Sequence, residues 1–295
     1  YIWSSYTYTG NIITLDNKHN LILIERDSDL SKSSDEFSST KGNFTLSKYN
    51  KDLNLIWKRK IFDPENGLNP QQIINENHHV ISKVTSDSEN NILIIGATRY
   101  KKGISFGNSY SPDYLMSNEY WSLETAGYLK KYSSAGEEIF GTYIGDRGKS
   151  FISDIVIGNN DEIIIAGDGN NNPKAVLESN HFQSDYNNNT YVNESGLLMK
   201  FDKLGNPIWG FVIGDKAYNH RLNGLDYDKL TKEIVSAGGS NSPYMISTPN
   251  GFQTKPIYEP ESGRLAGGNA TIVLFSDVPN DFKIDKAGDD CFFDT

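Results

Sequence analysis

NILIIG at residues 91–96 is a short apolar run, and close copies of it return along the chain at a fixed spacing. The copies read NLILIE at 20–25, EIIIAG at 162–167 and EIVSAG at 233–238, so that each lies 71 residues from the next. A fixed period across most of a chain indicates one supersecondary unit stacked on copies of itself. Each run is rich in Ile, Leu and Val over its whole length, which is typical of a strand buried on both faces.

A second motif follows each run and predicts a β-hairpin. It reads FTLSKYNKDLNLIW at 44–57, YLKKYSSAGEEIF at 128–140 and LLMKFDKLGNPIW at 197–209, with a degenerate copy, TIVLFSDVPNDF, at 271–282. Two β-prone runs joined by Gly, Asn and Asp residues are typical of a hairpin. The third unit is therefore expected to hold four strands, at 152–157, 162–167, 196–202 and 207–214.

Together the motifs predict an all-β fold, a β-propeller built from four-stranded antiparallel blades, with about four repeats and a partial repeat at each end. The expected division of the single domain, 1–295, is a partial blade strand at 1–10, blades at 11–66, 67–145, 146–214 and 215–288, and the start of a further repeat at 289–295. A parallel β-helix is the main alternative, and its much shorter rungs disfavour it. The number of blades, the closure of the ring and the status of Tyr1 as a mature N-terminus or a boundary in a longer chain stay open.

The composition argues against several functional classes. The formal net charge is −10 and no basic residues cluster in the sequence, which argues against nucleic acid as a partner. No apolar run approaches the ~20 residues that a membrane-spanning helix needs. Cys291 is the only cysteine, so the chain holds neither an internal disulfide nor a metal cluster of several thiolates.

The sequence carries no signature of nucleophilic catalysis, and the chain is expected to be noncatalytic. It lacks the G-x-S-x-G elbow, and its single cysteine has no evident catalytic partner. A propeller enzyme acting on polysaccharide, a glycoside hydrolase or lyase, is the alternative, because 38 Asp and Glu residues leave room for a catalytic pair of carboxylates.

Alternation of strand direction places the longest connections, at 26–43, 97–126, 168–195 and 239–268, on one face of the propeller. Loops on a rigid scaffold are where recognition usually resides, and Tyr and Trp supply stiff contact area for proteins and sugars. The candidate binding-face aromatics in these segments are Tyr110, Tyr114, Tyr120, Trp121, Tyr186, Tyr191, Tyr244 and Tyr258. The structural alternative is that they pack the long segments onto the blades.

Two sets of polar residues suggest roles other than recognition. Asp168 and Asn170 begin an Asp/Asn-rich stretch with hard oxygen ligands, which suggests calcium, but the stretch lacks the spacing of an EF-hand and equally suits a turn. No cofactor is therefore expected. Asp16, Asp87, Asp154 and Asp226 recur at similar spacing, and they are predicted to tie down loops.

Three segments resemble the SBBP repeat, a β-propeller repeat of bacterial proteins. They are STPNGFQTKP at 247–256, NHFQSDY at 180–186 and GLLMKFDKLGNPIWGFVIGD at 196–215. The resemblance implies an exported, noncatalytic propeller of Bacteroidetes-like bacteria, extracellular or on the cell surface and associated with the outer membrane. It also implies a module for protein or glycan binding, a type IX secretion cargo, or a subunit of an envelope assembly.

Overall fold

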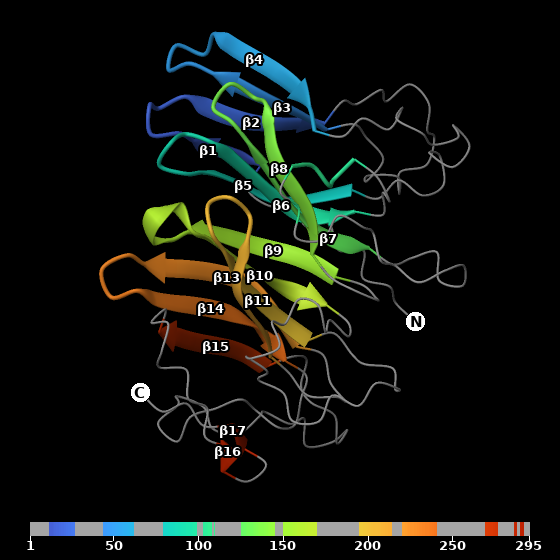
Figure 1. Ribbon diagram of the computed structural model, residues 1–295, viewed down its shortest axis with the longest axis vertical. Helices are drawn as coiled ribbons and strands as arrows, with labels where there is room; N and C mark the ends of the chain where they lie inside the picture. Colours follow the sequence, from blue (N-terminus) through green and yellow to red (C-terminus); the bar gives the residue numbers. More distant parts are fainter. Residues whose placement is uncertain are drawn as a thin grey trace, which may run out of the picture.

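The computed structural model describes residues 12–26, 44–61, 79–98, 103–107, 109, 125–144, 150–169, 195–213, 220–240, 269–276, 286–287 and 290–291. Within these residues the fold is all-β, as the sequence predicts, with one turn of 3-10 helix, η2 (Asn159–Asp161). The strands form antiparallel sheets, and Figure 1 shows these sheets stacked one on another along the long axis.

Three sheets have four strands each, and in every sheet neighbouring strands follow one another along the chain. The first contains β1 (Ile13–Leu15), β2 (Leu21–Arg26), β3 (Phe44–Tyr49) and β4 (Leu55–Lys60). The second contains β5 (His79–Ser86), β6 (Ile92–Thr98), β7 (Ala126–Tyr132) and β8 (Glu138–Ile144). The third contains β9 (Ser150–Ile157), β10 (Ile163–Gly169), β11 (Ser195–Phe201) and β12 (Pro207–Ile213).

The fourth sheet has three strands, β13 (His220–Asp228), β14 (Glu233–Ser240) and β15 (Asn269–Ser276). A separate two-stranded ladder joins β16 (Lys286–Ala287) to β17 (Asp290–Cys291). The four strands predicted for the third unit are confirmed, and each begins and ends within two residues of its expected bounds.

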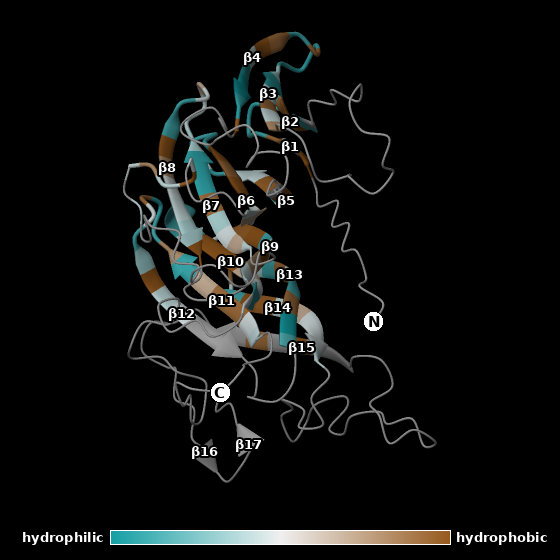
Figure 2. Cartoon of the chain, turned by 90° about the vertical axis from the view of Figure 1, so that its right-hand side faces the viewer, coloured by the Kyte–Doolittle hydropathy of each residue, from teal (hydrophilic) through white to brown (hydrophobic). Residues whose placement is uncertain are grey.

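Each central strand sends alternate side chains into two different cores, which explains its continuous apolar sequence. On β6, Ile92 and Ile94 lie in the core between the first and second sheets, whereas Leu93 and Ile95 lie in the core between the second and third. The strand β10 repeats this division between the second and fourth sheets. Figure 2 shows both strands coloured mostly as hydrophobic. A sheet covered on both faces needs apolar residues at every position of its central strands.

The sheets approach one another most closely at their inner strands. β1 lies against β5, β5 against β9, and β9 against β13. The outer strands contact the next sheet through side chains. The ring of Trp57 on β4, for example, packs on Gly136, and a Cβ added to Gly136 would lie 3.0 Å from this ring. The stack therefore has a narrow inner side and a wider outer side.

A bulge on the inner strands explains the glycine that ends the repeated motif. The pairing register shifts between Ile81 and Lys83 on β5, and equivalent shifts occur on β9 and β13. The bulged inner strand brings one of its backbone carbonyl oxygens over the neighbouring second strand. A Cβ added to the glycine of the second strand would lie about 2 Å or less from this oxygen. The positions affected are Gly96, Gly167 and Gly238. A Cβ on them would lie 1.9 Å from the carbonyl oxygen of Val80, 2.1 Å from that of Phe151 and 1.7 Å from that of Arg221, respectively.

The outer strands of the first two sheets are protected in different ways. Next to β8, Phe106 pairs with Gly141 in an antiparallel bridge and Ile104 is fully buried. β4 is exposed along nearly its whole length and ends in Lys58, Arg59 and Lys60. Charged side chains on an exposed edge oppose edge-to-edge aggregation.

Candidate functional site

The two ends of every sheet differ in the connections they carry. Tight turns join the first strand to the second, and the third to the fourth, at one end, and most of these turns lie on the left in Figure 1. The second strand is joined to the third at the opposite end, because neighbouring strands are antiparallel. These longer connections span 27–43, 99–125, 170–194 and 241–268. The one-sided arrangement expected from the sequence is therefore present, and we call this side the long-segment end.

The eight candidate aromatics lie outside the described residues. They are Tyr110, Tyr114, Tyr120, Trp121, Tyr186, Tyr191, Tyr244 and Tyr258. Their placement in segments that leave the long-segment end follows from the strand order, and their role in binding stays a prediction.

The strand ends at the long-segment end are polar although they are buried, a feature that the sequence reasoning missed. The buried polar residues there are Thr98, Ser150, Asp168, Ser195, His220 and Ser240. Several occupy equivalent places, since His79 pairs with Thr98 in the second sheet and His220 pairs with Ser240 in the fourth. The 71-residue spacing of Thr98, Gly169 and Ser240 was the signal that could have revealed them.

Ser150 joins the second and third sheets at this end. Its hydroxyl donates to the carbonyl oxygen of Ile144 at 2.7 Å and accepts from the backbone N–H of Gly127 at 2.8 Å. Its own backbone N–H donates to the carbonyl oxygen of Thr125 at 2.7 Å. These bonds fix where the segment that precedes β7 meets the stack.

Asp168, one of the two calcium candidates, lies within β10 and its side chain is buried. Strand alternation places Asp168 on the same face of β10 as Ile164 and Ala166, and this face packs against the fourth sheet. His220 is buried on the face of the fourth sheet that packs against β10. Among the described residues no three His, Cys, Asp or Glu side chains are grouped so as to hold a metal ion. Asn170 lies outside the described residues, so calcium at this place stays untested.

At the opposite end, buried aspartates organise the tight turns. Asp16 accepts hydrogen bonds from the backbone N–H groups of Lys18 (2.9 Å) and Asn20 (2.8 Å), and its second oxygen lies 2.9 Å from Nζ of Lys48. Asp87 repeats this pattern 71 residues later, with Lys131 at 2.9 Å. We call each such arrangement a turn clasp.

The pKa of Asp16 reflects the turn clasp. Burial alone would raise this pKa, but the hydrogen bonds from Lys48, Asn20 and Lys18 outweigh burial and lower it from 3.8 to about 2. Asp16 is therefore a charged structural group at neutral pH. Both of its carboxylate oxygens accept hydrogen bonds within the turn clasp.

The lysines of the turn clasps also bind the next sheet. Nζ of Lys48 donates to the carbonyl oxygen of Ser134 at 3.3 Å, and Nζ of Lys131 donates to that of Lys203 at 2.9 Å. Trp57 Nε1 donates to the same Ser134 oxygen at 3.1 Å. Successive sheets are thereby locked together at the tight-turn end.

The predicted series of four aspartates is wrong in part, because its members occupy different structural positions. Asp16 and Asp87 do tie down turns, but the equivalent positions in the third and fourth sheets are Gly158 and Asp228. Asp154 instead lies within β9, where it pairs with Lys83 at 2.6 Å and accepts from the backbone N–H of Leu225 at 2.8 Å. Asp226 lies on β13 and accepts from its neighbour, Tyr227. Similar spacing alone did not distinguish these positions.

The third sheet keeps its lysine and moves the carboxylate. Lys200 on β11 pairs with Glu162 at 2.7 Å, four residues beyond Gly158. The ion pair is therefore retained although the turn residue has changed.

One buried cluster between the first and second sheets departs from the repeat. Lys130, on β7, pairs with Ile94 on β6. At the equivalent place in the third sheet, Met199 pairs with Ile165. Nζ of Lys130 is 2.5 Å from Oε1 of Glu138 and donates to the carbonyl oxygens of Ile61 and Gly103. Burial lowers the pKa of Lys130, and Glu138 opposes part of that effect.

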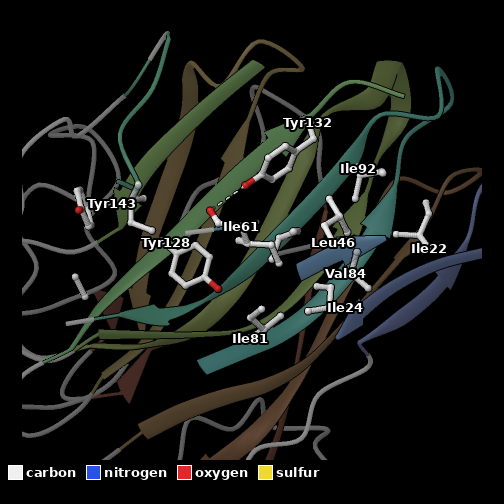
Figure 3. Close-up of a cluster of buried hydrophobic side chains, with 13 residues drawn as sticks. Ile22, Ile24, Leu46, Ile61, Ile81, Val84, Ile92, Tyr128, Tyr132 and Tyr143 are labelled. Atoms are coloured by element: carbon white, nitrogen blue, oxygen red, sulfur yellow. Dashed lines mark hydrogen bonds between the residues drawn. The ribbon is translucent and has the colours of Figure 1, made fainter. Parts of the chain in front are cut away.

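Two tyrosines complete this cluster. The hydroxyl of Tyr132 donates to the carbonyl oxygen of Ile61 at 3.3 Å, and Figure 3 shows this bond among the surrounding apolar side chains. Tyr128 donates to the carbonyl oxygen of Val80 at 3.2 Å. Burial raises the pKa of both hydroxyls. Every polar group of the cluster is engaged by another, so the cluster holds the segment at 61 and the segment at 103 against the sheet.

No protein-family model matches the chain, and no curated protein matches its sequence. The resemblance to SBBP repeats therefore stays a prediction. The residues that the structure describes contain no helix long and apolar enough to cross a membrane. The described residues form a stack of sheets that hydrogen bonds join to one another, and their buried lysines are paired with carboxylates. The long connections leave this stack from one end.

Proposed function

We propose that the chain is a noncatalytic β-propeller module that binds a protein or a glycan through the long segments at one end. The observation that carries the proposal is that all four sheets send their long second-to-third strand connection from the same end. The opposite end is closed by turns of a few residues. Recognition on a rigid scaffold characteristically uses segments gathered in this way.

The scaffold is well suited to hold such segments in place. Sheets are linked at the long-segment end through Ser150 and at the tight-turn end through Lys48 and Lys131. In the second and third sheets, both ends of the long segment are thus anchored in strands that are buried on two faces. Anchoring lowers the entropy that the segments lose when a ligand binds.

The expected ligand class follows from the aromatic content of the segments. Tyr and Trp stack on sugar rings and bury large areas at protein interfaces. A location outside the cell or on the outer membrane, and a role as a subunit or cargo of an envelope or secretion assembly, are supported by the resemblance to SBBP repeats alone.

The experiment compares substitutions at the two ends of the stack. The purified chain is applied to a glycan array and to a detergent extract of bacterial envelopes, beside the double variants Tyr120→Ala/Trp121→Ala and Tyr186→Ala/Tyr191→Ala. The matched control is Leu204→Ala/Leu230→Ala, because both leucines are exposed and lie in tight turns. Binding that falls at least tenfold in the aromatic variants and is retained by the control supports the proposal.

Three results would contradict it. Binding that is lost only in the control places the site at the other end. No binding to any glycan or envelope protein argues against a recognition module. Cleavage of a bound polysaccharide would show that the chain is an enzyme.

A further inference from the structure

A short segment at 103–107 lies along the outer edge of the second sheet. It comes from the first part of the long connection between β6 and β7. The backbone N–H groups of Phe106 and Gly141 each donate to the carbonyl oxygen of the other residue, at 3.1 and 2.9 Å. The segment therefore pairs with β8 through two hydrogen bonds to a single residue, and we call it the strap.

The strap has one buried side chain and one largely exposed aromatic side chain. Ile104 is fully buried in the core between the first and second sheets, whereas Phe106 is 48% exposed. The strap also lies close to Gly141, since a Cβ on this glycine would lie 1.9 Å from the carbonyl oxygen of Ile104. An apolar anchor and a backbone pair thus attach the strap to the sheet, in place of a full ladder.

A glycine at each end of the strap has a left-handed backbone conformation. The φ angle is +85° at Gly103 and +61° at Gly107. Glycine adopts such angles without steric cost, and small residues often serve as hinges. Gly107 also lies against β8, because a Cβ on it would lie 2.4 Å from the carbonyl oxygen of Ile139. The strap therefore has a glycine at each place where it would turn on leaving the sheet.

A buried lysine joins the strap to the rest of the stack. Nζ of Lys130 donates to the carbonyl oxygen of Gly103 at 3.1 Å and to that of Ile61, which follows β4, at 3.3 Å. Hydrogen bonds from a charged donor are stronger than those between neutral groups. The residues at the equivalent place in the other sheets are Ser47, Met199 and Val273. The repeat therefore gains a cation in the sheet that carries the strap.

We propose that the strap is a latch, held closed by Lys130, which opens at its two glycines and uncovers the outer edge of β8 while the rest of the stack stays folded. A unit with few buried apolar contacts opens at a lower free energy than the core. By contrast, β7 is paired on both sides and buried along its whole length.

The latch bears on the long connection that contains it. When the strap is closed, this connection is fixed to the edge of β8, and when it is open, the connection is held at the ends of β6 and β7. Opening is measured without a ligand, so this inference does not depend on the proposed function.

The first test is amide hydrogen exchange of the unmodified chain, resolved by NMR at several urea concentrations below the unfolding midpoint. We expect equal protection of the Phe106 and Gly141 amides, at least tenfold below that of the amides of β6, with little response to urea. Local opening exposes little surface, whereas unfolding of the core exposes much and responds to urea. Protection equal to that of β6, with the same response to urea, would overturn the proposal.

Two neighbouring lysines test what holds the latch. Lys130→Met leaves the carbonyl oxygen of Gly103 without its charged donor, so it should lower the protection of the strap amides at least tenfold. The matched control is Lys131→Met, because Lys131 binds the third sheet through the carbonyl oxygen of Lys203. The control should leave the protection of the strap unchanged while it lowers the stability of the whole chain.

A hinge variant keeps the test decisive if Lys130→Met does not fold. Gly107→Ala places a Cβ against the carbonyl oxygen of Ile139, so it should also lower the protection of the strap at least tenfold, with β6 unchanged. Unchanged protection of the strap in Gly107→Ala, or in a folded Lys130→Met, would overturn the proposal. An equal effect of Lys131→Met, or an equal loss of protection throughout the chain, would overturn it too.

Discussion

Breaking the turn clasp of the second sheet should cost far more than breaking an ion pair on the surface nearby. Asp87 is 1% exposed and Lys131 is 4% exposed, and their charged atoms are 2.9 Å apart. Removing one partner of a buried pair leaves an uncompensated charge, which costs about 3–5 kcal/mol. Lys131 keeps its bond to the carbonyl oxygen of Lys203, which places Asp87→Asn near the lower limit, at about 3 kcal/mol.

Two further variants separate charge from turn geometry. Asp87→Ala also removes the acceptor for the backbone N–H groups of Glu89 and Asn91, each worth about 1 kcal/mol, so its cost should be near 4–5 kcal/mol. Asp87→Asn combined with Lys131→Met removes both charges, and its cost should fall to about 1 kcal/mol.

The matched control is Glu89→Gln, because Glu89 and Lys203 form an exposed pair at 3.1 Å in the same turns. It should leave stability unchanged, since solvent screens such pairs. Free energies of unfolding are measured by urea titration followed by tryptophan fluorescence. A cost below about 1 kcal/mol for Asp87→Asn, or a double variant as unstable as the single one, would refute the argument.

Two other predictions concern acid stability and a matched pair of serines. Because the pKa of Asp16 is lowered from 3.8 to about 2 in the folded chain, its contribution to stability is present above the unfolded pKa and is lost as pH falls from about 4 to 2; urea midpoints across this range should fall less steeply in Asp16→Asn, and an unchanged slope would count against the turn clasp. Ser153→Ala should cost about 1 kcal/mol, because the hydroxyl donates to the carbonyl oxygen of Leu222 in the next sheet. Ser82→Ala should be neutral or stabilising, because its buried hydroxyl has no hydrogen-bond partner among the described residues. Equal thermal shifts for the two serine variants would contradict this.

The strands could be predicted from sequence because their signal is local and repeated. Runs such as 92–96 and 163–167 contain no polar side chain, and the structure confirms that the central strands of the second and third sheets are covered on both faces. The turns were also foreseeable, since Asn and Asp bind their own backbone two and four residues on. The terminal Gly of the repeated motif was visible too, but its cause is a carbonyl on a different strand.

Features that depend on pairing between strands were not foreseeable. The lysines of the turn clasps lie 32 and 44 residues from their aspartates, across a connection of variable length, so no fixed spacing marks them. For the same reason the four aspartates were grouped by spacing although Asp154 and Asp226 lie within strands. Lys130 was missed because a lysine in a strand is ordinarily exposed, and only the approach of the segments at 61 and 103 buries it.

The dissociation constant of the first glycan or envelope protein that the chain retains tests the proposed division between scaffold and binding segments. It is measured for the unmodified chain, for Tyr186→Ala/Tyr191→Ala and for Leu204→Ala/Leu230→Ala, with thermal melting confirming that all three are folded. We expect a rise of at least tenfold for the tyrosine variant and no change for the leucine variant. An unchanged constant for every aromatic variant, or a rise confined to the leucine variant, would contradict it.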